Sequence, residues 1–296
     1  MKSRIVIGVS GMVGEHILNV LAVRESQVLT TYNKTPVSSA EKLNIADKAE
    51  VDEIIQRISP DIIYLPAAIT NVDYCENHLE ESYNVNVIGV QNIVNASNSA
   101  GSRLVYFSTD YIFDGKNGPY DESTAANPIS EYGRQKLEAE HYIALFAEDY
   151  LIIRTTVVFG WERQGKNFVY RLIKSLSNGV AVNVPVDQIG TPTYVNNLAQ
   201  IAVQLSETSM QGVINVAGSR LINRYEFAKK AAAVFMLDEN LIKPVRTDEL
   251  YQSARRPLSA GLLTAKLEDV SPIPIVDYED GLRLMAGERP STLGAI

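Results

Sequence analysis

Short apolar runs alternate with segments of helical periodicity over the first half of the chain. In residues 48–58, for example, Val51, Ile54 and Ile55 recur at the spacing of one helix face. Patterns of these two kinds predict strands at residues 4–7, 27–32, 61–65, 103–108 and 150–154, and helices at 12–21, 48–58, 80–100 and 131–146. Because this alternation favours βαβ units, we expect an α/β fold with a doubly wound parallel sheet covered by helices on both faces.

The pattern changes after residue 160. Helical periodicity continues at residues 167–177, 194–206 and 224–235, the strand-like segments at 180–185 and 212–217 are short, and 243–275 is extended and interrupted by proline. We interpret residues 161–296 as a smaller α+β region, interleaved with segments near 187–217 that return to the larger domain, 1–160. The last residues, 286–296, are rich in glycine, proline and small side chains, which predicts partial disorder.

Composition and charge narrow the classes of function. Hydrophobic residues make up 46% and charged residues 21%, as in ordinary globular proteins. No apolar run approaches the ~20 residues that span a bilayer, and residues 1–4 lead straight into a strand, so we expect a cytoplasmic protein without a membrane partner. The single cysteine, Cys75, excludes an intramolecular disulfide. A net charge of −8 argues against nucleic acid as a partner.

A glycine-rich turn follows the first predicted strand. Gly8, Gly11 and Gly14 stand three residues apart, and Met12 and Val13 open the predicted helix. Glycines permit a tight turn and a close approach of the backbone to a pyrophosphate, which the N–H groups of a helix N-terminus can bind. The alternative is an ordinary strand–helix turn. At the start of a βαβ unit, the pattern favours a Rossmann-type dinucleotide-binding domain in which these five residues contact the cofactor.

The end of the second strand bears on the choice of dinucleotide. A carboxylate there would bind the ribose 2′-hydroxyl of NAD, whereas a cation suits the 2′-phosphate of NADP. Residues 30–34 contain no carboxylate and end in Asn33 and Lys34. We therefore favour NADP(H) over NAD(H), with Asn33 and Lys34 as contacts, and the alternative for Lys34 is a hydrated loop lysine.

Tyr132 and Lys136 form a Tyr-x-x-x-Lys pair on the predicted helix 131–146. Residues four apart share a helix face, and an ammonium beside a phenol lowers the pKa of the phenol. Such a tyrosine can donate a proton to a carbonyl oxygen as a hydride arrives. Thr109 ends an apolar strand, where ligands bind in parallel sheets, and its hydroxyl could hold the substrate oxygen against Tyr132. The alternative for Thr109 is a capping role.

Several longer motifs of the chain resemble those of a known family. The chain resembles the extended short-chain dehydrogenase/reductase superfamily and, within it, the dTDP-4-dehydrorhamnose reductase family. The residues that carry the resemblance are 8–14, 60–63, 67–73, 108–115, 128–136, 154–155, 187–193 and 254–257. It implies an NADPH-dependent reduction of the C4 keto group of a 4-keto-6-deoxy nucleotide sugar, bound by the smaller region, in the synthesis of dTDP-L-rhamnose.

The resemblance also implies roles for single residues. Thr109, Tyr132 and Lys136 would be the catalytic set, and Lys136 would also hold the nicotinamide ribose. Further cofactor contacts would be Ala67, Ala68, Thr70 and Asn86, with Asn86 supporting the catalytic residues. Tyr111 and Arg256 would bind the nucleotide sugar, since a guanidinium suits a diphosphate. For Arg256, the alternative is an ordinary surface residue.

Departures from the family pattern leave other functions open. Val157 stands where the family often has tryptophan, which puts the exact sugar in doubt. The family's carboxylates linked to magnesium-dependent dimerisation do not align, so we predict no metal and retain a homodimer only as an option. Phe159 and Gly160 also suit the non-catalytic, NADP-binding regulatory subunit of methionine adenosyltransferase. An epimerase or dehydratase would need a further acid or base, such as Asp110.

Overall fold

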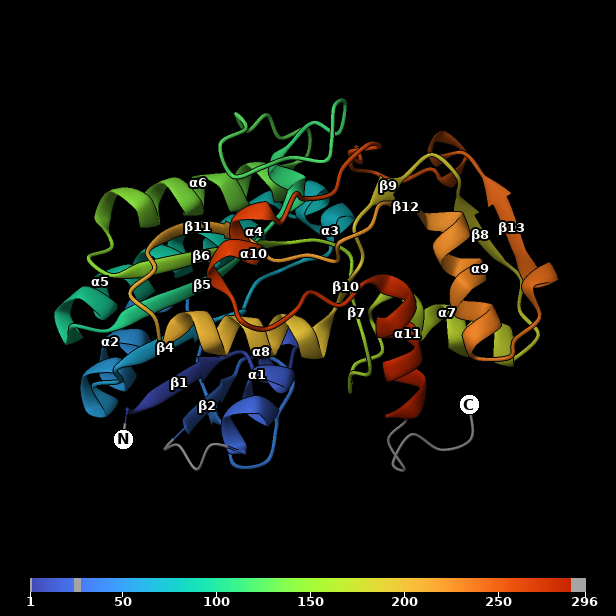
Figure 1. Cartoon of the computed structure of the whole chain (residues 1–296). Coiled ribbons are helices and arrows are strands. Elements are labelled where there is room, and N and C mark those ends of the chain that lie inside the picture. The colour runs from blue at the N-terminus through green and yellow to red at the C-terminus, as the bar shows by residue number, and fades with distance from the viewer. Residues whose placement is uncertain (1, 24–27, 289–296) are drawn as a thin grey trace.

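A seven-stranded parallel sheet forms the centre of the computed structural model, which describes residues 2–23 and 28–288 (Figure 1). The strand order is β11-β6-β5-β4-β1-β2-β3. The strands are β1 (Arg4–Ile7), β2 (Val28–Tyr32), β3 (Glu41–Lys42), β4 (Ile62–Leu65), β5 (Arg103–Thr109), β6 (Tyr150–Thr155) and β11 (Gly212–Asn215). After β3 the chain crosses to the other side of β1, so the strand order reverses between β1 and β4, where Rossmann-type folds bind dinucleotides.

Helices cover both faces of the sheet (Figure 1). One face packs against α1 (Met12–Ala22) and α8 (Val195–Ser206), and the other packs against α2 (Lys48–Ile58), α5 (Gly89–Ala100) and α6 (Glu131–Phe146). The strands alternate their side chains between the two cores: Val6 faces α1 and α8, whereas Ile5 and Ile7 face α2 and α5. The doubly wound α/β fold expected from the sequence is confirmed.

The predicted helix 80–100 is in fact three consecutive segments. These are α4 (Leu79–Tyr83), a π-helical turn η1 (Asn84–Ile88) and α5, which ends at Gly101 in the left-handed region (φ 65°). A π turn widens a helix by one residue, is uncommon, and often lies at functional sites. Its position in this chain matters because it contains Asn86. Apolar periodicity cannot reveal it, since an inserted residue shifts the pattern only locally.

A second core, built mainly from the carboxyl-terminal half of the chain, lies beside the main sheet at the right of Figure 1. Its elements are α7 (Phe168–Ser177), α9 (Arg224–Val234), α11 (Tyr278–Gly287) and the parallel pair β8 (Val182–Pro185) and β13 (Ile242–Val245). Phe227 is fully buried at its centre, between Phe159, Phe168 and Tyr278. Helix α8 and strand β11, although later in the chain than α7, pack with the main sheet instead.

Several short elements join or extend these two cores. They are α3 (Val72–Asn77), β7 (Val158–Phe159), β9 (Ile189–Gly190), β10 (Thr193–Tyr194), β12 (Ile222–Asn223), α10 (Ala265–Val270), and the 3-10 turns η2 (Asp110–Ile112), η3 (Glu239–Leu241) and η4 (Thr247–Leu250). The sequence pattern missed β3, α3, α10 and α11. Helix α11 had a readable signal, because Asp277 caps it and Tyr278, Leu282 and Met285 share its buried face.

The predicted disorder of residues 286–296 is wrong at its start and otherwise untested. Ala286 and Gly287 belong to α11, while residues 289–296 lie outside the described residues. The physical reason is that Met285 is fully buried and holds the last turn of the helix against the second core. Within the described ranges, no helix is long and apolar enough to cross a membrane.

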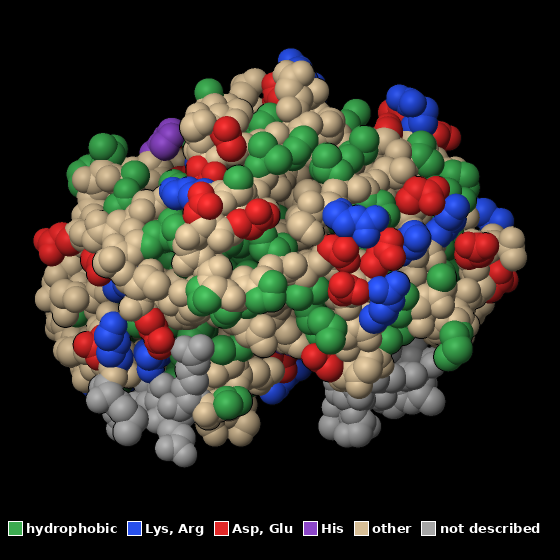
Figure 2. All heavy atoms as spheres, viewed as in Figure 1, with side chains coloured by type: hydrophobic (Ala, Val, Ile, Leu, Met, Phe, Trp, Pro, Cys, Tyr) green, Lys and Arg blue, Asp and Glu red, His purple; other side chains and the backbone are tan. Residues whose placement is uncertain are grey.

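Charges of both signs are interspersed on the face shown in Figure 2. Over the second core, Arg220 pairs with Asp277 at 3.1 Å and Arg283 pairs with Asp280 at 2.7 Å. Such exposed pairs contribute little to stability.

Candidate active site

The glycine turn between β1 and α1 is closely packed at two of its three glycines. Gly8 has a φ of +101°, and a Cβ there would lie 3.0 Å from the Cβ of Ala67, which follows β4. A Cβ on Gly14 would lie 2.4 Å from the carbonyl oxygen of Gly8. These contacts leave no room for a side chain at either position. The two glycines therefore let α1 and the end of β4 approach the same turn.

Gly11 has a different role, because it leaves the first turn of α1 open. It is the N-cap and offers no side chain to cap the helix, whereas α2, α6 and α7 all have side-chain acceptors at this position. A Cβ on Gly11 would meet only the carbonyl oxygen of Gly8, at 3.5 Å. The first N–H groups of the helix, including those of Met12 and Val13, have no intrahelical acceptor. This positive helix end fits the pyrophosphate of a dinucleotide.

The loop of residues 161–166 lies against this turn. Gln164 donates its side-chain N–H to the carbonyl oxygen of Ser10, and Arg163 pairs with Glu15 at 2.7 Å. The loop connects the first core to α7, so the second part of the chain is tied directly to the predicted cofactor turn.

A cavity of about 490 Å³ lies beyond the end of β2. Its walls include Asn33, Lys34, Glu80, Glu81 and Asn84. Lys34 is exposed, and its ammonium lies 2.7 Å from Glu81, which also accepts a hydrogen bond from Tyr74. The predicted cation for a 2′-phosphate is therefore present at the edge of a suitable cavity, with a carboxylate beside it that sequence reasoning did not foresee.

Asn86 holds the segment after β4 in place. Its side chain accepts from the backbone N–H of Ile69 at 2.8 Å and donates to the carbonyl oxygen of Ile69 at 3.1 Å and to Gln135 at 2.9 Å. Ile69 lies between the predicted cofactor residues Ala68 and Thr70, and Gln135 precedes Lys136 on α6. Asn86 is 1% exposed, and it joins this loop to α6, the helix that carries Tyr132 and Lys136.

Thr109 ends β5 and caps the 3-10 turn η2. Its side-chain oxygen accepts from the N–H of Tyr111 at 3.2 Å, and the hydroxyl donates to Asp110 at 3.3 Å. Thr109 therefore has the capping role given as its alternative. It also belongs to the site, because its hydroxyl is close enough to the phenol of Tyr132 to lower the pKa of that phenol. Tyr132 in turn packs edge-on against Tyr111, with ring centroids 5.8 Å apart.

The expectation that Lys136 lowers the pKa of Tyr132 is wrong, because the pKa of Tyr132 is raised. Burial is the largest influence and raises the pKa of Tyr132, while the nearby hydroxyl of Thr109 lowers it. Lys136 is 2% exposed, donates to the carbonyl oxygen of Phe107 at 2.7 Å and lies 4.0 Å from the ring centroid of Tyr106. Burial lowers the pKa of Lys136 to about 7, against a smaller opposing effect of Glu140. Desolvation therefore favours the neutral form of both side chains.

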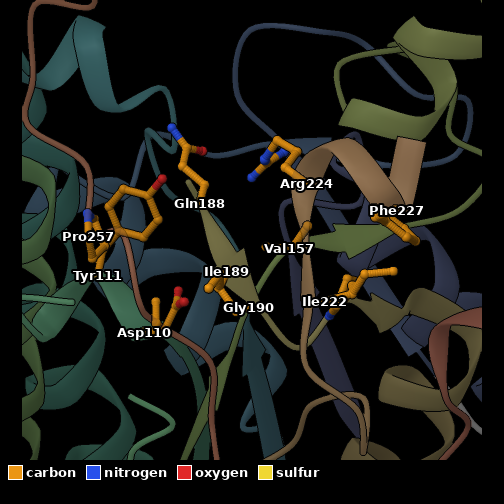
Figure 3. Close-up of a pocket in the computed structure, with 12 residues that line it drawn as sticks. Asp110, Tyr111, Val157, Gln188, Ile189, Gly190, Ile222, Arg224, Phe227 and Pro257 are labelled. Atoms are coloured by element: carbon orange, nitrogen blue, oxygen red, sulfur yellow. The ribbon is translucent and has the colours of Figure 1, made fainter. Parts of the chain in front are cut away.

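A second pocket lies between the two cores, next to Thr109 (Figure 3). Asp110 and Tyr111 line one side of it, Arg224 and Phe227 line the other, and Gln188 lies near Tyr111. Its volume is about 30 Å³, which is small for a ligand site.

Val157 lines the same pocket in a strained conformation. Its φ is +40°, and it is the only β-branched residue with a positive φ among those the structure describes. Branched side chains rarely adopt this conformation, and such strain concentrates at functional sites. The position at which the chain departs from the family's tryptophan therefore borders the pocket.

Arg256 is held by the protein rather than exposed to solvent. Its guanidinium donates to Asp73 at 2.6 Å and to the carbonyl oxygen of Ala254 at 3.0 Å, and its side chain is 8% exposed. The pair joins the 254–257 segment to α3. Sequence reasoning proposed Arg256 for the nucleotide sugar and missed Gln188 and Arg224, although Gln188 stood in a motif that was singled out.

No cluster that could hold a metal ion is present within the described ranges, in the sense of three or more His, Cys, Asp or Glu side chains together. Cys75 is buried, and burial raises the pKa of its thiol to about 11. It donates to the carbonyl oxygen of Ile69 at 3.4 Å, so it is packed into the positioning network around Asn86.

Comparison with known proteins identifies the family. A family model described as the RmlD substrate binding domain matches residues 2–289. This chain belongs to that family. A dTDP-4-dehydrorhamnose reductase of Aggregatibacter actinomycetemcomitans is 32% identical over 254 residues, which cover 82% of this chain and 86% of that protein. The resemblance noted in the sequence is thereby confirmed.

A solved structure and a second kind of curated protein are also similar to this chain. The crystal structure of dTDP-4-dehydrorhamnose reductase from Bacillus anthracis in complex with NADP has a TM-score of 0.89 at 31% identity, covering 96% of this chain and 98% of that one. Methionine adenosyltransferase 2 subunit beta of Danio rerio is 32% identical over 235 residues, or 77% of this chain and 72% of that protein. The two kinds of relative correspond to the two leading interpretations of the sequence.

Proposed function

We propose that this protein is an NADPH-dependent reductase that acts on the C4 keto group of a 4-keto-6-deoxy nucleotide sugar, as a dTDP-4-dehydrorhamnose reductase in dTDP-L-rhamnose synthesis. The observation that carries the proposal is that Thr109, Tyr132 and Lys136 lie near the carboxyl end of β5, on the same edge of the parallel sheet as the open glycine turn after β1. The reductases among the relatives support it.

The three side chains divide the chemistry between them. Bound NADPH would supply the hydride that adds to the carbonyl carbon. Tyr132 keeps its proton at neutral pH because burial raises its pKa, so it can donate that proton to the carbonyl oxygen. Thr109, beside Tyr132, would orient the same oxygen, and Lys136 lies one helical turn along α6, where it donates to the carbonyl oxygen of Phe107 in β5. Much of the rate would come from this alignment.

The choice of NADPH rests on the cavity beyond β2. Lys34 at its edge is a cation suited to a 2′-phosphate, and the similar reductase of Bacillus anthracis was crystallised with NADP. NADH remains the second candidate, since Glu81 beside Lys34 opposes a phosphate. A 4-keto nucleotide sugar is the proposed partner, the cytoplasm the proposed location, and a homodimer the proposed assembly, which sedimentation equilibrium would measure.

Replacement of Tyr132 tests the proposal. We expect Tyr132→Phe to lose about 10²- to 10⁴-fold in kcat with dTDP-4-dehydrorhamnose and NADPH, because it lacks the proton donor, while NADPH still quenches the fluorescence of Trp161. Tyr142→Phe is the matched control, since Tyr142 lies on the same helix and contacts Asn95 instead. Turnover of Tyr132→Phe at the native rate would refute the catalytic assignment.

A regulatory subunit of methionine adenosyltransferase is the second candidate. It is favoured by the similarity to the Danio rerio subunit and by Phe159 and Gly160, which also suit that subunit. The wild-type protein would then bind NADPH, oxidise none of it with dTDP- or UDP-linked 4-keto sugars, and change the rate of a purified methionine adenosyltransferase. An epimerase is less well supported, because Asp110 is fully engaged by Thr156 at 2.6 Å and by Thr109.

A further inference from the structure

Arg224 is a cation in an unusual place. It is the first residue of α9, whose N-cap Asn223 accepts from the N–H of Glu226. A positive side chain is disfavoured at this end of a helix, because the helix dipole is itself positive there. Stability alone therefore gives no reason for an arginine at this position.

The guanidinium of Arg224 is not used within the protein. Among residues that the structure describes, none forms an ion pair or a side-chain hydrogen bond with it, and its contact is the ring of Phe168, 4.8 Å from Cζ to the centroid. In Figure 3 it points across the pocket toward the space between Gln188 and Tyr111. Its donors are thus available to a ligand in that pocket.

Arg256, in contrast, has its donors committed. One terminal nitrogen binds Asp73 and the other binds the Ala254 carbonyl oxygen. Using Arg256 for a ligand anion would break a 2.6 Å ion pair and leave Asp73 uncompensated. Arg224 requires no such exchange.

Two further guanidinium groups, those of Arg171 and Arg256, act on Arg224. Burial is the largest influence and lowers the pKa of Arg224; Tyr111 and Asp110 oppose it, whereas Arg171 and Arg256 add to it. The nearest carboxylate on the opposite wall, Asp110, is buried and bound by Thr156 and Thr109. An anion between the walls would relieve the repulsion among the three guanidinium groups.

We propose that Arg224 binds the diphosphate of the nucleotide sugar, as the principal anion contact of the substrate pocket. The planar fork of a guanidinium can hold two phosphate oxygens at once. A diphosphate at this point would separate the nucleoside from a sugar that reaches past Tyr111 toward Thr109 and Tyr132. The inference rests on the proposed function for its substrate, and on Arg224 itself for the site.

Calorimetric titration with dTDP and with UDP tests this proposal without turnover. We expect Arg224→Gln to bind the better of the two about 10- to 100-fold more weakly than the wild type, as the loss of charge-assisted hydrogen bonds implies. Arg224→Lys, which keeps the charge but not the fork, should fall between. Arg220→Gln is the matched control, because Arg220 pairs with Asp277 and Glu279 outside the pocket, and it should bind like the wild type.

The outcomes separate the inference from the proposed function. NADPH affinity and the melting temperature of Arg224→Gln should match the wild type, and in a reductase assay KM for the keto sugar should rise more than kcat falls. If the binding of dTDP or UDP depends on Arg224 but the wild-type protein reduces no keto sugar, the proposed site stands and the proposed function is overturned. Native affinity and native KM in Arg224→Gln, or no binding of either diphosphate by the wild type, would overturn the site.

Discussion

At the scale of single residues, burial decides the protonation of the candidate catalytic pair. It raises the pKa of the Tyr132 phenol and lowers the pKa of the Lys136 ammonium to about 7. Both shifts favour the uncharged form, since a charge away from water is costly. Tyr132 is therefore a proton donor at neutral pH, which is the state that a carbonyl reduction requires.

The lowered pKa of Lys136 predicts how stability depends on pH. Between about pH 7 and the ordinary lysine value of 10.5, the unfolded chain binds a proton here that the folded protein does not. The contribution of Lys136 to the free energy of unfolding therefore rises with pH across this window and is lowest below pH 7. Lys136→Met removes this dependence. We therefore expect the free energy of unfolding of Lys136→Met, compared with that of the wild type, to be higher at pH 6.5 than at pH 9.5.

Urea unfolding at pH 6.5, 8 and 9.5 would measure this effect. The exposed Lys243 provides the control, because Lys243→Met should leave the pH profile parallel to that of the wild type. Parallel profiles for Lys136→Met as well would show that Lys136 is charged in the folded protein.

Lys34 and Glu81 predict the preference for the cofactor. Lys34→Ala should raise KM for NADPH by about tenfold and leave KM for NADH nearly unchanged, because only NADPH has the 2′-phosphate. Glu81→Gln should lower KM for NADPH by roughly threefold, since it removes the carboxylate 2.7 Å from Lys34. Steady-state kinetics with both cofactors provides the comparison, and an unchanged NADPH/NADH ratio in both variants would place the 2′-phosphate elsewhere.

At the scale of elements, the strand–turn–helix unit β1-α1 combines two kinds of glycine. Gly14 is needed for packing, since its neighbour is the Gly8 carbonyl oxygen, whereas Gly11 leaves space beside the helix end. A sequence motif treats the three glycines alike. Their different surroundings show which of them serves the fold and which serves a ligand.

This difference predicts opposite results for two alanine variants. Gly14→Ala should lower the free energy of unfolding by about 1–3 kcal/mol, because its Cβ would lie 2.4 Å from a backbone oxygen. Gly11→Ala should leave stability nearly unchanged but weaken NADPH binding, because its methyl group enters the space proposed for the pyrophosphate. Urea titration and fluorescence titration together decide this, and equal loss of stability in both variants would contradict it.

At the scale of the whole molecule, the candidate site lies where separate parts of the chain meet. The glycine turn and Tyr132 belong to the first core, while Gln188 and Arg224 approach from the second, and the 161–166 loop connects the two. The proposed division into 1–160 and 161–296 remains a prediction. Residues 195–206 and 212–215 nevertheless pack with the main sheet, as do Leu267, Ile273 and Ile275.

Cofactor binding should therefore stabilise the molecule as a whole. A ligand at about 100 times its dissociation constant adds about 2.7 kcal/mol to the free energy of unfolding, so we expect NADPH to raise the melting temperature by about 5 °C or more. AMP at the same concentration, which lacks the pyrophosphate bridge, should have a much smaller effect. Differential scanning calorimetry would measure both, and equal shifts for NADPH and AMP would exclude pyrophosphate binding at α1.

The sequence alone determined the elements whose signals are local. Helices Lys48–Ile58 and Glu131–Phe146 have their predicted bounds, because each shows apolar periodicity and begins after a capping residue. The glycine turn and the Tyr132–Lys136 spacing were equally readable, since their geometry depends on neighbours within a few positions. The pattern could not reveal the π turn around Asn86, which is stabilised by contacts to Ile69 and Gln135.

The tertiary structure decided the charges of the site and the partners of its arginines. Asp73 and Arg256 are 183 positions apart, so nothing local announces that they pair. Arg224 lacked any motif, and only the fold shows that it faces Tyr111 across a pocket. The pKa of Tyr132 is raised, whereas the sequence predicted that Lys136 would lower it, because desolvation depends on everything packed around a side chain.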